Sequence, residues 1–280
     1  MTVMPDPVLA GQRMSEDYQR NIGRMGMRDV LVASCGGAGQ SYVGNILHEL
    51  SVNYVDAYTE ELREDGTAVA RTEHGGYRKH LASLHDKDNT APPVEPWPRL
   101  VKTHHPPEMF PDGSFGAVWL LVRDPRDALY SLYQWRHNFA EAEWDRVPPT
   151  FEGWLSGRGD FTASPVDDWT AFHQAWLRRT PDCTVLRFED LKRDPEGALT
   201  EPLRRLGVRF DEARLRRAAD NSSFDKMRAH EDAVSATGEP RMIRDGRVAG
   251  WQRWMTPELA GFFRDDELRA VAVKFGYDLD

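Results

Sequence analysis

Short apolar runs alternate with amphipathic stretches along most of the chain. Residues 29–34 (DVLVAS) and 184–188 (TVLRF) have the length and composition of strands, and residues 99–104 (RLVKTH) form another short extended run. Residues 117–122 (AVWLLV) are continuously apolar, which is typical of a parallel strand buried on both faces. These runs predict the strands of a central sheet.

Amphipathic stretches follow the predicted strands. Asp124 and Pro125 supply an N-cap residue and a first-turn proline to one of them, and Gly207 is placed to end another. Because strands alternate with helices, we expect one α/β domain with a central, mostly parallel sheet flanked by helices. The predicted helices cover residues 42–50, 124–132, 166–178, 194–207 and 268–275.

Two polar stretches, 64–98 and 230–240, are interpreted as loops. Neither has the change in composition that marks an interdomain linker, so residues 28–280 are predicted to form a single domain. Residues 1–27 are predicted to be a loosely attached N-terminal extension.

Composition and charge narrow the possible partners. The 280 residues carry 36 Lys and Arg against 45 Asp and Glu, a net charge of −9, so we expect no nucleic-acid partner. The sequence has no apolar run of about 18 residues and no apolar signal segment at its start, so we expect a cytoplasmic protein without a membrane partner. Two distant cysteines, Cys35 and Cys183, indicate neither a disulfide framework nor a zinc site, and no metal is predicted.

A glycine-rich loop, Cys35–Ser41 (CGGAGQS), joins the first predicted strand to its helix. Backbone N–H groups of such a loop, with the positive end of the helix dipole, form a good site for phosphate oxygens. No G-K-[ST] follows the glycines, so this is not an ATPase-type loop. A tight turn that binds nothing is the alternative interpretation.

Two further clusters carry candidate chemistry. Lys102 and His104 lie two residues apart on an extended segment and therefore share one face, whereas His105 alternates to the other face. A neutral imidazole can take a hydroxyl proton, and an ammonium can stabilise charge on a leaving oxygen. Arg123 directly follows a buried strand, and Ser131 lies two helical turns later; both residue types bind phosphate.

These segments, in this order, resemble the sulfotransferases that use 3′-phosphoadenosine 5′-phosphosulfate (PAPS). The loop motif stands here as SCGGAGQSY, with Tyr42 in its aromatic position, and the KTH motif as Lys102-Thr103-His104. The matched motifs further along the chain are Arg123 with Ser131, FEDL at 188–191, SSF at 222–224 and RDGRVAGW at 244–251. The resemblance implies the PAPS-binding α/β fold, with a P-loop-like strand, loop and helix for the phosphosulfate.

The resemblance also implies roles for individual residues. His104 would be the general base for the acceptor hydroxyl, and Lys102 would lie near the bridging oxygen of the donor. The implied nucleotide-binding residues are Gly36, Gly37, Ala38, Gly39, Gln40 and Ser41 for the 5′-phosphosulfate, Arg123, Ser131, Arg244 and Gly246 for the 3′-phosphate, and Tyr42, Ser222 and Phe224 for adenine. Phe188 and Asp245, which stand within the matched motifs, are also expected among the nucleotide-binding residues. PAPS would leave as 3′-phosphoadenosine 5′-phosphate (PAP).

The chain departs from the family pattern at four positions. Gly37 replaces the loop lysine that touches the phosphosulfate, and Phe188 replaces a tyrosine. Asp245 replaces a basic residue, and Gly250 replaces the Asp or Asn before Trp251. Either Lys102 and the loop amides suffice without the lysine, another cation reaches in, or donor handling is altered.

The predicted reaction is in-line transfer of a sulfuryl group from PAPS to a hydroxyl of a small-molecule acceptor. Two alternatives stay open: a non-catalytic or altered nucleotide-binding homologue, and a P-loop-type phosphotransferase. The acceptor is not specified, although Trp135, Trp144 and Trp154 could line its pocket or simply pack in the core. The oligomeric state is open, with a homodimer as the candidate, and residues 230–240 are a candidate lid.

Overall fold

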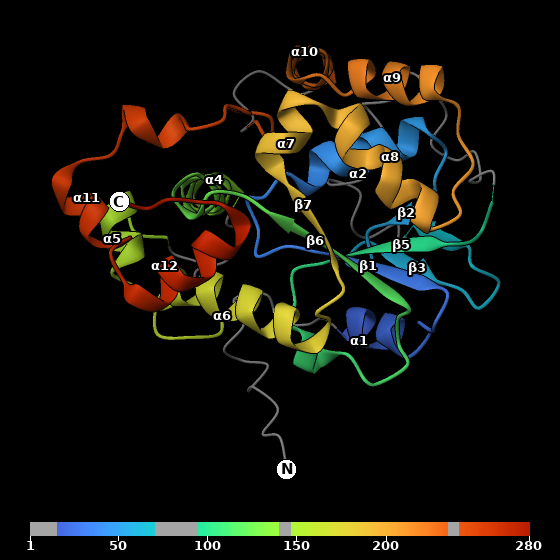
Figure 1. Ribbon diagram of the computed structural model, residues 1–280, viewed down its shortest axis with the longest axis horizontal. Coiled ribbons are helices and arrows are strands. Elements are labelled where there is room, and N and C mark those ends of the chain that lie inside the picture. Colours follow the sequence, from blue (N-terminus) through green and yellow to red (C-terminus); the bar gives the residue numbers. More distant parts are fainter. Residues whose placement is uncertain (1–15, 71–94, 140–146, 235–240) are drawn as a thin grey trace.

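A five-stranded parallel sheet forms the centre of the molecule in the computed structural model, which describes residues 16–70, 95–139, 147–234 and 241–280 (Figure 1). Its order is β2-β5-β1-β6-β7, so the first long strand lies in the middle. The strands are β1 Asp29–Ala33, β2 Tyr54–Val55, β5 Arg99–Thr103, β6 Ala117–Val122 and β7 Thr184–Arg187. The predicted α/β class and its parallel sheet are confirmed.

Helices cover both faces of the sheet, with α2, α8 and α9 on one side and α6 and α12 on the other (Figure 1). The α-helices are α1 Glu16–Ile22, α2 Gln40–Glu49, α4 Pro125–Phe139, α5 Phe151–Leu155, α6 Pro165–Arg179, α7 Phe188–Arg193, α8 Pro195–Arg205, α9 Glu212–Asn221, α10 Phe224–Val234, α11 Pro257–Gly261 and α12 Asp266–Ala272. Short 3-10 helices are η2 Pro107–Met109, η4 Gly250–Arg253 and η5 Val273–Phe275. None of the described helices is long and apolar enough to cross a membrane.

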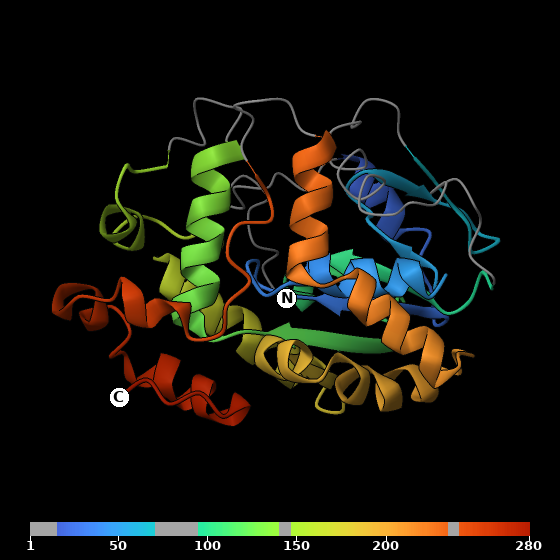
Figure 2. The same ribbon diagram turned by 90° about the horizontal axis from the view of Figure 1, so that it is seen from above.

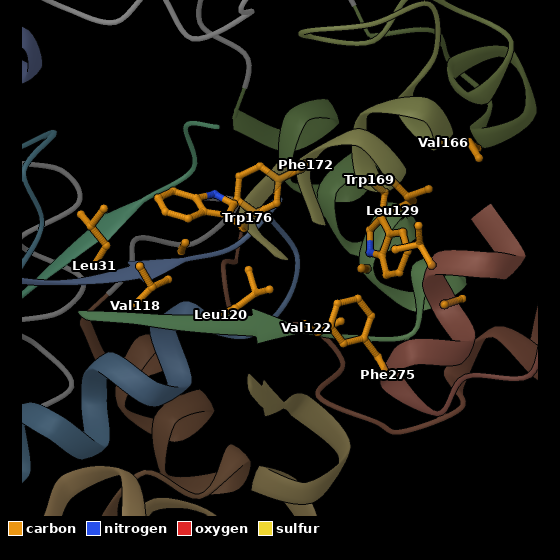
Figure 3. Packing of buried hydrophobic residues seen from close by; sticks show 14 of the residues in the cluster. Leu31, Val118, Leu120, Val122, Leu129, Val166, Trp169, Phe172, Trp176 and Phe275 are labelled. Carbon is orange, nitrogen blue, oxygen red and sulfur yellow. The ribbon is translucent and has the colours of Figure 1, made fainter. Parts of the chain in front are cut away.

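Alternation along the strands builds two cores, one on each face of the sheet. Leu120 and Val122 of β6 point toward Trp169 and Trp176 of α6 (Figure 3), while Leu121 belongs to the opposite cluster. All of these side chains are at most 1% exposed. The continuous apolar run of β6 is therefore explained by burial on both faces.

Helix ends follow the capping residues visible in the sequence. The Asp194 side chain accepts a hydrogen bond from the Gly197 N–H at the start of α8, as expected of an N-cap residue. The Asp124 carboxylate accepts from the Arg126 N–H at the start of α4. Both helices thus begin where the sequence predicted.

The two predicted loops are wrong in part. Ala68–Ala70 form β4, which pairs antiparallel with β3 (Glu60–Leu62), so the stretch 64–98 begins with a hairpin. The start of the stretch 230–240 continues α10, which runs to Val234 and includes the buried Glu231. Residues 71–94 and 235–240 lie outside the described residues, so the candidate lid stays a prediction.

Residues 16–22 are packed rather than loosely attached. Tyr18 and Asn21 of α1 are fully buried, and the Asn21 amide donates to the carbonyls of Ala57 and Glu60, at 2.8 and 2.6 Å. The Tyr18 hydroxyl donates to the Lys102 carbonyl, 3.3 Å away. Buried polar groups satisfied in this way tie the helix to the core. The domain boundary at residue 28 stays a prediction.

Candidate active site

One cavity of about 980 Å³ opens where the strands β1, β5 and β6 end at their carboxyl edge. Ligand sites of open α/β sheets lie at this edge. The cavity is lined by most of the residues predicted from the sequence: Gly36, Gly37, Gly39, Gln40, Ser41, Tyr42, Lys102, His104, Arg123, Ser131, Phe188, Phe224, Arg244, Asp245 and Gly246. Residues separated by some 200 positions are thus brought together at one site.

The glycine loop takes a backbone path that requires glycine. Gly37 has a φ of +66°, and a Cβ built there would lie 2.1 Å from the Ala128 carbonyl oxygen at the start of α4. A Cβ on Gly39, whose φ is +89°, would lie 2.5 Å from the Phe188 ring. The loop therefore has no room for a lysine at position 37 in this conformation.

Gln40 is buried and braces the strands behind the loop. Its side-chain amide donates to the carbonyls of Val32 and Thr103, at 2.7 and 3.1 Å, and so links the ends of β1 and β5. An anion at this loop would therefore meet backbone N–H groups and the Ser41 hydroxyl rather than a charged side chain.

His104 is fixed in one tautomer. Its Nδ1 lies 2.9 Å from the Ser34 carbonyl oxygen, which can only accept, so Nδ1 carries the proton and Nε2 keeps a free lone pair. Burial and the nearby Lys102 lower the pKa of His104 to about 3, so the ring is neutral near pH 7. Its backbone N–H donates to the Tyr58 hydroxyl, 2.9 Å away.

Lys102 forms a buried ion pair in the cavity wall. Its Nζ lies 2.9 Å from Asp56 Oδ2. By contrast, His105 does not line the cavity and packs with the rings of Tyr18 and Tyr58, at centroid distances of 4.7 and 5.6 Å. The predicted alternation of these side chains along the segment is therefore observed.

Arg123 joins the glycine loop to the C-terminal part of the site. It donates to the carbonyls of Gly37 and Arg247, at 3.1 and 3.0 Å, and its guanidinium lies 4.3 Å from the centroid of the Phe188 ring. Arg244 donates to the Ser131 carbonyl, 2.9 Å away. Arg123 Nε and Arg244 Nη1 are buried without a hydrogen-bond partner among the described residues. Such donors are costly unless a ligand accepts from them.

The segment that carries Arg244 is held between two helices. Figure 2 shows α4 (green) and α10 (orange) standing alongside each other, with the chain after residue 241 passing between them. The buried Glu231 carboxylate of α10 accepts from the backbone N–H groups of Met242 and Ile243, at 2.6 and 2.9 Å. This contact, which joins residues 11 and 12 positions apart, had no signal in the sequence.

Tyr42 and Phe224, the predicted adenine sandwich, both line the cavity, and Lys192 Nζ lies 5.2 Å from the Tyr42 ring centroid. Ser222 is fully buried: its hydroxyl donates to the Ala218 carbonyl and accepts from the Asn45 amide, at 2.7 and 2.8 Å. Neither Ser222 nor Ala38 is among the described residues that line the cavity. Their nucleotide contacts stay predictions.

Two of the other departures from the motif pattern, Asp245 and Gly250, have local partners. Asp245 pairs with Arg247 at 3.1 Å and with Arg253, so its acidic charge is neutralised beside the cavity. The Gly250 N–H donates to the Asp127 carboxylate, 3.1 Å away. These contacts stabilise the same turn that a basic residue and an Asp or Asn occupy in the motif.

Two kinds of residue were missed from the sequence. Asp56 and Tyr58 line the cavity just after β2, a strand of two residues that is too short to give a hydrophobic pattern. Arg136 and Asp160, which also line the cavity, form an ion pair. Asp56 directly follows the buried Val55, so the reasoning applied to Arg123 would have found it had β2 been recognised.

Aromatic side chains also contribute to the cavity lining. Trp135 and Trp154 line it together with Phe161, while Trp144 lies outside the described residues. Trp154 is only 5% exposed and packs on Phe151 and Tyr133, so it serves the core as well. Within the described residues, no group of three or more His, Cys, Asp or Glu could hold a metal ion.

A parallel sheet with a glycine loop after its central strand and arginines at its carboxyl edge is an α/β arrangement that suits a phosphorylated ligand. The sequence profile of the sulfotransferase domain family matches residues 28–269. The chain therefore belongs to the sulfotransferase domain family, and the resemblance inferred from the motifs is confirmed.

Curated relatives are distant. The chain is 27% identical to sulfotransferase 2A6 of Rattus norvegicus over 179 residues, which cover 59% of this chain and 61% of that protein. It is 26% identical to sulfotransferase 1A1 of Mus musculus over 174 residues, 58% of each chain. The alignments thus span about three fifths of the relatives' length.

Solved structures share the fold over nearly the whole chain. The mouse sulfotransferase SULT7A1 complexed with PAP has a TM-score of 0.62 and 15% identity, covering 92% of this chain and 94% of that one. Retinol dehydratase in a complex with retinol and PAP has a TM-score of 0.58 and 18% identity, covering 95% and 88%. At these identities the likeness establishes the fold.

Proposed function

We propose that this protein is a PAPS-dependent sulfotransferase that transfers a sulfuryl group to a hydroxyl of a small-molecule acceptor. Membership of the family and the PAP named in the structural neighbours support the donor. The observation that carries the proposal is one cavity that holds both a neutral His104 beside Lys102 and the arginines Arg123 and Arg244 beside the glycine loop.

The nucleotide end of the cavity, which we define as residues 34–41 with Arg123, Ser131 and Arg244, suits a doubly phosphorylated adenosine. Arg123 Nε and Arg244 Nη1, which lack a partner within the described parts of the chain, would donate to the 3′-phosphate. The backbone N–H groups of the loop would hold the 5′-phosphosulfate, and Tyr42 and Phe224 would stack on adenine.

The reaction end, which we define as Asp56, Tyr58, Lys102 and His104 with the Arg136–Asp160 pair, would perform the transfer. His104 Nε2 accepts the hydroxyl proton as the acceptor oxygen bonds to sulfur. The bond between sulfur and the 5′-phosphate oxygen breaks, and its electron pair stays on that oxygen, where the Lys102 ammonium donates a hydrogen bond. Sulfuryl transfer resembles phosphoryl transfer, so catalysis rests on positioning and on neutralising charge.

The tautomer of His104 fits the general-base role. The Ser34 carbonyl holds the proton on Nδ1, so Nε2 is the nitrogen that can accept. Desolvation and Lys102 keep the free ring neutral and therefore competent near pH 7. A bound polyanion would stabilise the imidazolium and raise this pKa, which brings the base closer to the value that general-base catalysis favours.

A binding protein without transfer activity is the second candidate. The absence of room for a lysine at Gly37 favours it, together with the pairing of Lys102 with Asp56, because both reduce the positive charge at the transferring group. Both candidates bind PAP, so only transfer separates them.

Two measurements test the proposal. Calorimetry compares PAP with adenosine 5′-phosphate, and we expect PAP to bind more tightly by about tenfold or more because of the arginine donors. Incubation with sulfur-35-labelled PAPS and a panel of phenols, sterols and sugars then detects transfer by the gain of a labelled sulfuryl group. Equal affinity for the two nucleotides contradicts the nucleotide assignment, and tight PAP binding without transfer to any acceptor or to water supports the second candidate.

A further inference from the structure

The partner of Lys102 comes from the neighbouring strand. β2 pairs in parallel with β5, with Val55 opposite Val101, so the next residue, Asp56, lies beside Lys102. The distance between Lys102 Nζ and Asp56 Oδ2 is 2.9 Å, and the two residues are 8% and 4% exposed. The sheet register itself therefore creates this ion pair.

Asp56 is held rigidly in its turn. Its Oδ1 accepts from the Tyr58 N–H at 3.1 Å, and its own N–H donates to Glu60 Oε2 at 2.7 Å. Tyr58 then accepts the His104 N–H at its hydroxyl, and its ring centroid lies 5.7 Å from Lys102 Nζ. One turn, Asp56–Tyr58, thus braces both residues assigned to the reaction.

The charge of Asp56 changes how strongly the Lys102 ammonium attracts the donor before and during transfer. The 5′-phosphosulfate is already an anion before transfer, so an unopposed ammonium would bind the ground state and the transition state alike. Uniform binding of this kind does not accelerate the chemical step. A carboxylate 2.9 Å away weakens attraction for the resting donor, yet it holds the ammonium in place for the charge that grows on the leaving oxygen.

The effect of Asp56 on Lys102 matters more in this protein because residues 34–41 contain no charged side chain. Gly37 occupies the loop position at which the family pattern has lysine, and the backbone there excludes even a Cβ. The orientation of Lys102 therefore bears more of the charge stabilisation on the leaving group.

We propose that Asp56 is a positioning residue that orients the Lys102 ammonium toward the leaving oxygen and limits how tightly that ammonium binds the resting nucleotide, an inference that rests on the proposed function. It acts through Lys102 and does not itself touch the transferred group. Removal of its charge should therefore tighten nucleotide binding and slow transfer, a combination that a merely structural role does not produce.

The test is Asp56→Asn, which keeps the size and one acceptor oxygen but removes the charge. We expect PAP to bind about threefold to tenfold more tightly. We expect single-turnover hydrolysis of labelled PAPS, with water as the acceptor, to slow by about tenfold or more. In the Lys102→Met background the same substitution should leave both quantities within about twofold, since the residue through which Asp56 acts is gone.

Asp112→Asn is the matched control, because it removes the same charge from an ion pair with Arg179 whose Asp112 side chain is 96% exposed. The inference is overturned if Asp56→Asn leaves PAP affinity unchanged, or changes it equally with and without Lys102. This measurement of affinity does not depend on whether the protein transfers sulfuryl groups.

If Asp56→Asn does not fold, Asp56→Glu keeps the charge but displaces it by one methylene. PAP affinity within about twofold with slower hydrolysis then supports the inference, and an unaltered hydrolysis rate overturns it. Failure of the proposed function is distinct: the parent protein itself would not bind PAP.

Discussion

The two ends of the cavity differ in how their charges are satisfied. At the nucleotide end, one buried donor of each arginine, Arg123 Nε and Arg244 Nη1, has no hydrogen-bond partner in the described parts of the chain, while Arg123 Nη2 lies 3.9 Å from Asp127 Oδ2. At the reaction end, Lys102 is already paired with Asp56, and Nδ1 of His104 already donates to a carbonyl. The nucleotide end thus keeps one unpartnered donor on each arginine for a ligand, whereas Lys102 and His104 Nδ1 at the reaction end already have internal partners.

The difference separates two properties of the site. Unsatisfied buried donors gain the most from a ligand that accepts from them, so affinity should come mainly from the nucleotide end. Groups with fixed partners are already oriented before the substrate binds, so the reaction end should mainly determine the rate of transfer. Substitutions at the two ends should therefore change different measured quantities.

The largest expected effect is at the reaction end. His104→Ala removes the proton acceptor, and the transfer rate should fall by about 10²–10⁴-fold. PAP affinity should stay within about twofold because the arginine donors are untouched. Single-turnover transfer and calorimetry on the same preparation measure both quantities. Transfer within about twofold of the parent rate would remove His104 from the mechanism.

The next effect concerns the backbone that joins the two ends. Gly37→Ala should destabilise the fold by about 1–3 kcal/mol more than Gly113→Ala, as measured by chemical denaturation. Both glycines have positive φ, +66° and +82°, so both variants carry a similar backbone strain. Only at Gly37 would the Cβ meet the Ala128 carbonyl, since nothing described lies within 4 Å of a Cβ at Gly113. Equal costs would show that the loop moves away from α4 freely.

A smaller effect is expected at the nucleotide end. Arg244→Met keeps much of the side-chain length but removes the donors, and PAP should bind about 10- to 100-fold more weakly. Adenosine 5′-phosphate, which lacks the 3′-phosphate, should bind nearly as before, and this serves as the internal control. If both nucleotides lose affinity equally by calorimetry, Arg244 does not contact the 3′-phosphate.

The sequence was sufficient for the features that depend on local pattern. The buried strand β6 and the cap at Asp194 follow from adjacent residues, and the Lys102–His104 spacing places both side chains on one face. Motif order then assembled most of the cavity lining without any knowledge of three-dimensional contacts.

The missed features depend on contacts between distant residues. Asp56 and Lys102 are 46 positions apart and meet only because β2, a strand of two residues, pairs with β5. Ser222 shows the opposite case: its motif is present, but its hydroxyl is engaged by Asn45, 177 positions away. The hydrophobic periodicity of the sequence does not indicate such pairs, because they depend on strand register and packing rather than on local propensity.

The smallest effect is expected for a substitution of His105, which tests whether the reaction end extends beyond His104. His105 follows His104 directly, yet it is 1% exposed and neither of its ring nitrogens has a partner among the described residues. His105→Phe should therefore leave the transfer rate within about twofold and change stability at pH 7 by less than about 1 kcal/mol. A larger loss of rate would extend the reaction end to the layer of Tyr18 and Tyr58 behind it.

The pH dependence of folding stability provides a second test of His105→Phe. Burial lowers the pKa of His105 to about 4, so the unfolded chain binds a proton that the folded chain refuses. The resulting stability is complete above about pH 6.5 and is lost as the pH falls toward 4, by up to about 1.4 kcal/mol per pH unit. His105→Phe should reduce the slope of stability against pH between pH 7 and 4 by this one-proton contribution, while His104 and His173 keep theirs. His173→Phe is the matched control, because the pKa of His173 is also lowered to about 4, but its Nδ1 lies 2.6 Å from the Trp169 carbonyl oxygen. His173→Phe should reduce the slope by a similar amount and, because that hydrogen bond is lost, should also cost about 1 kcal/mol at pH 7.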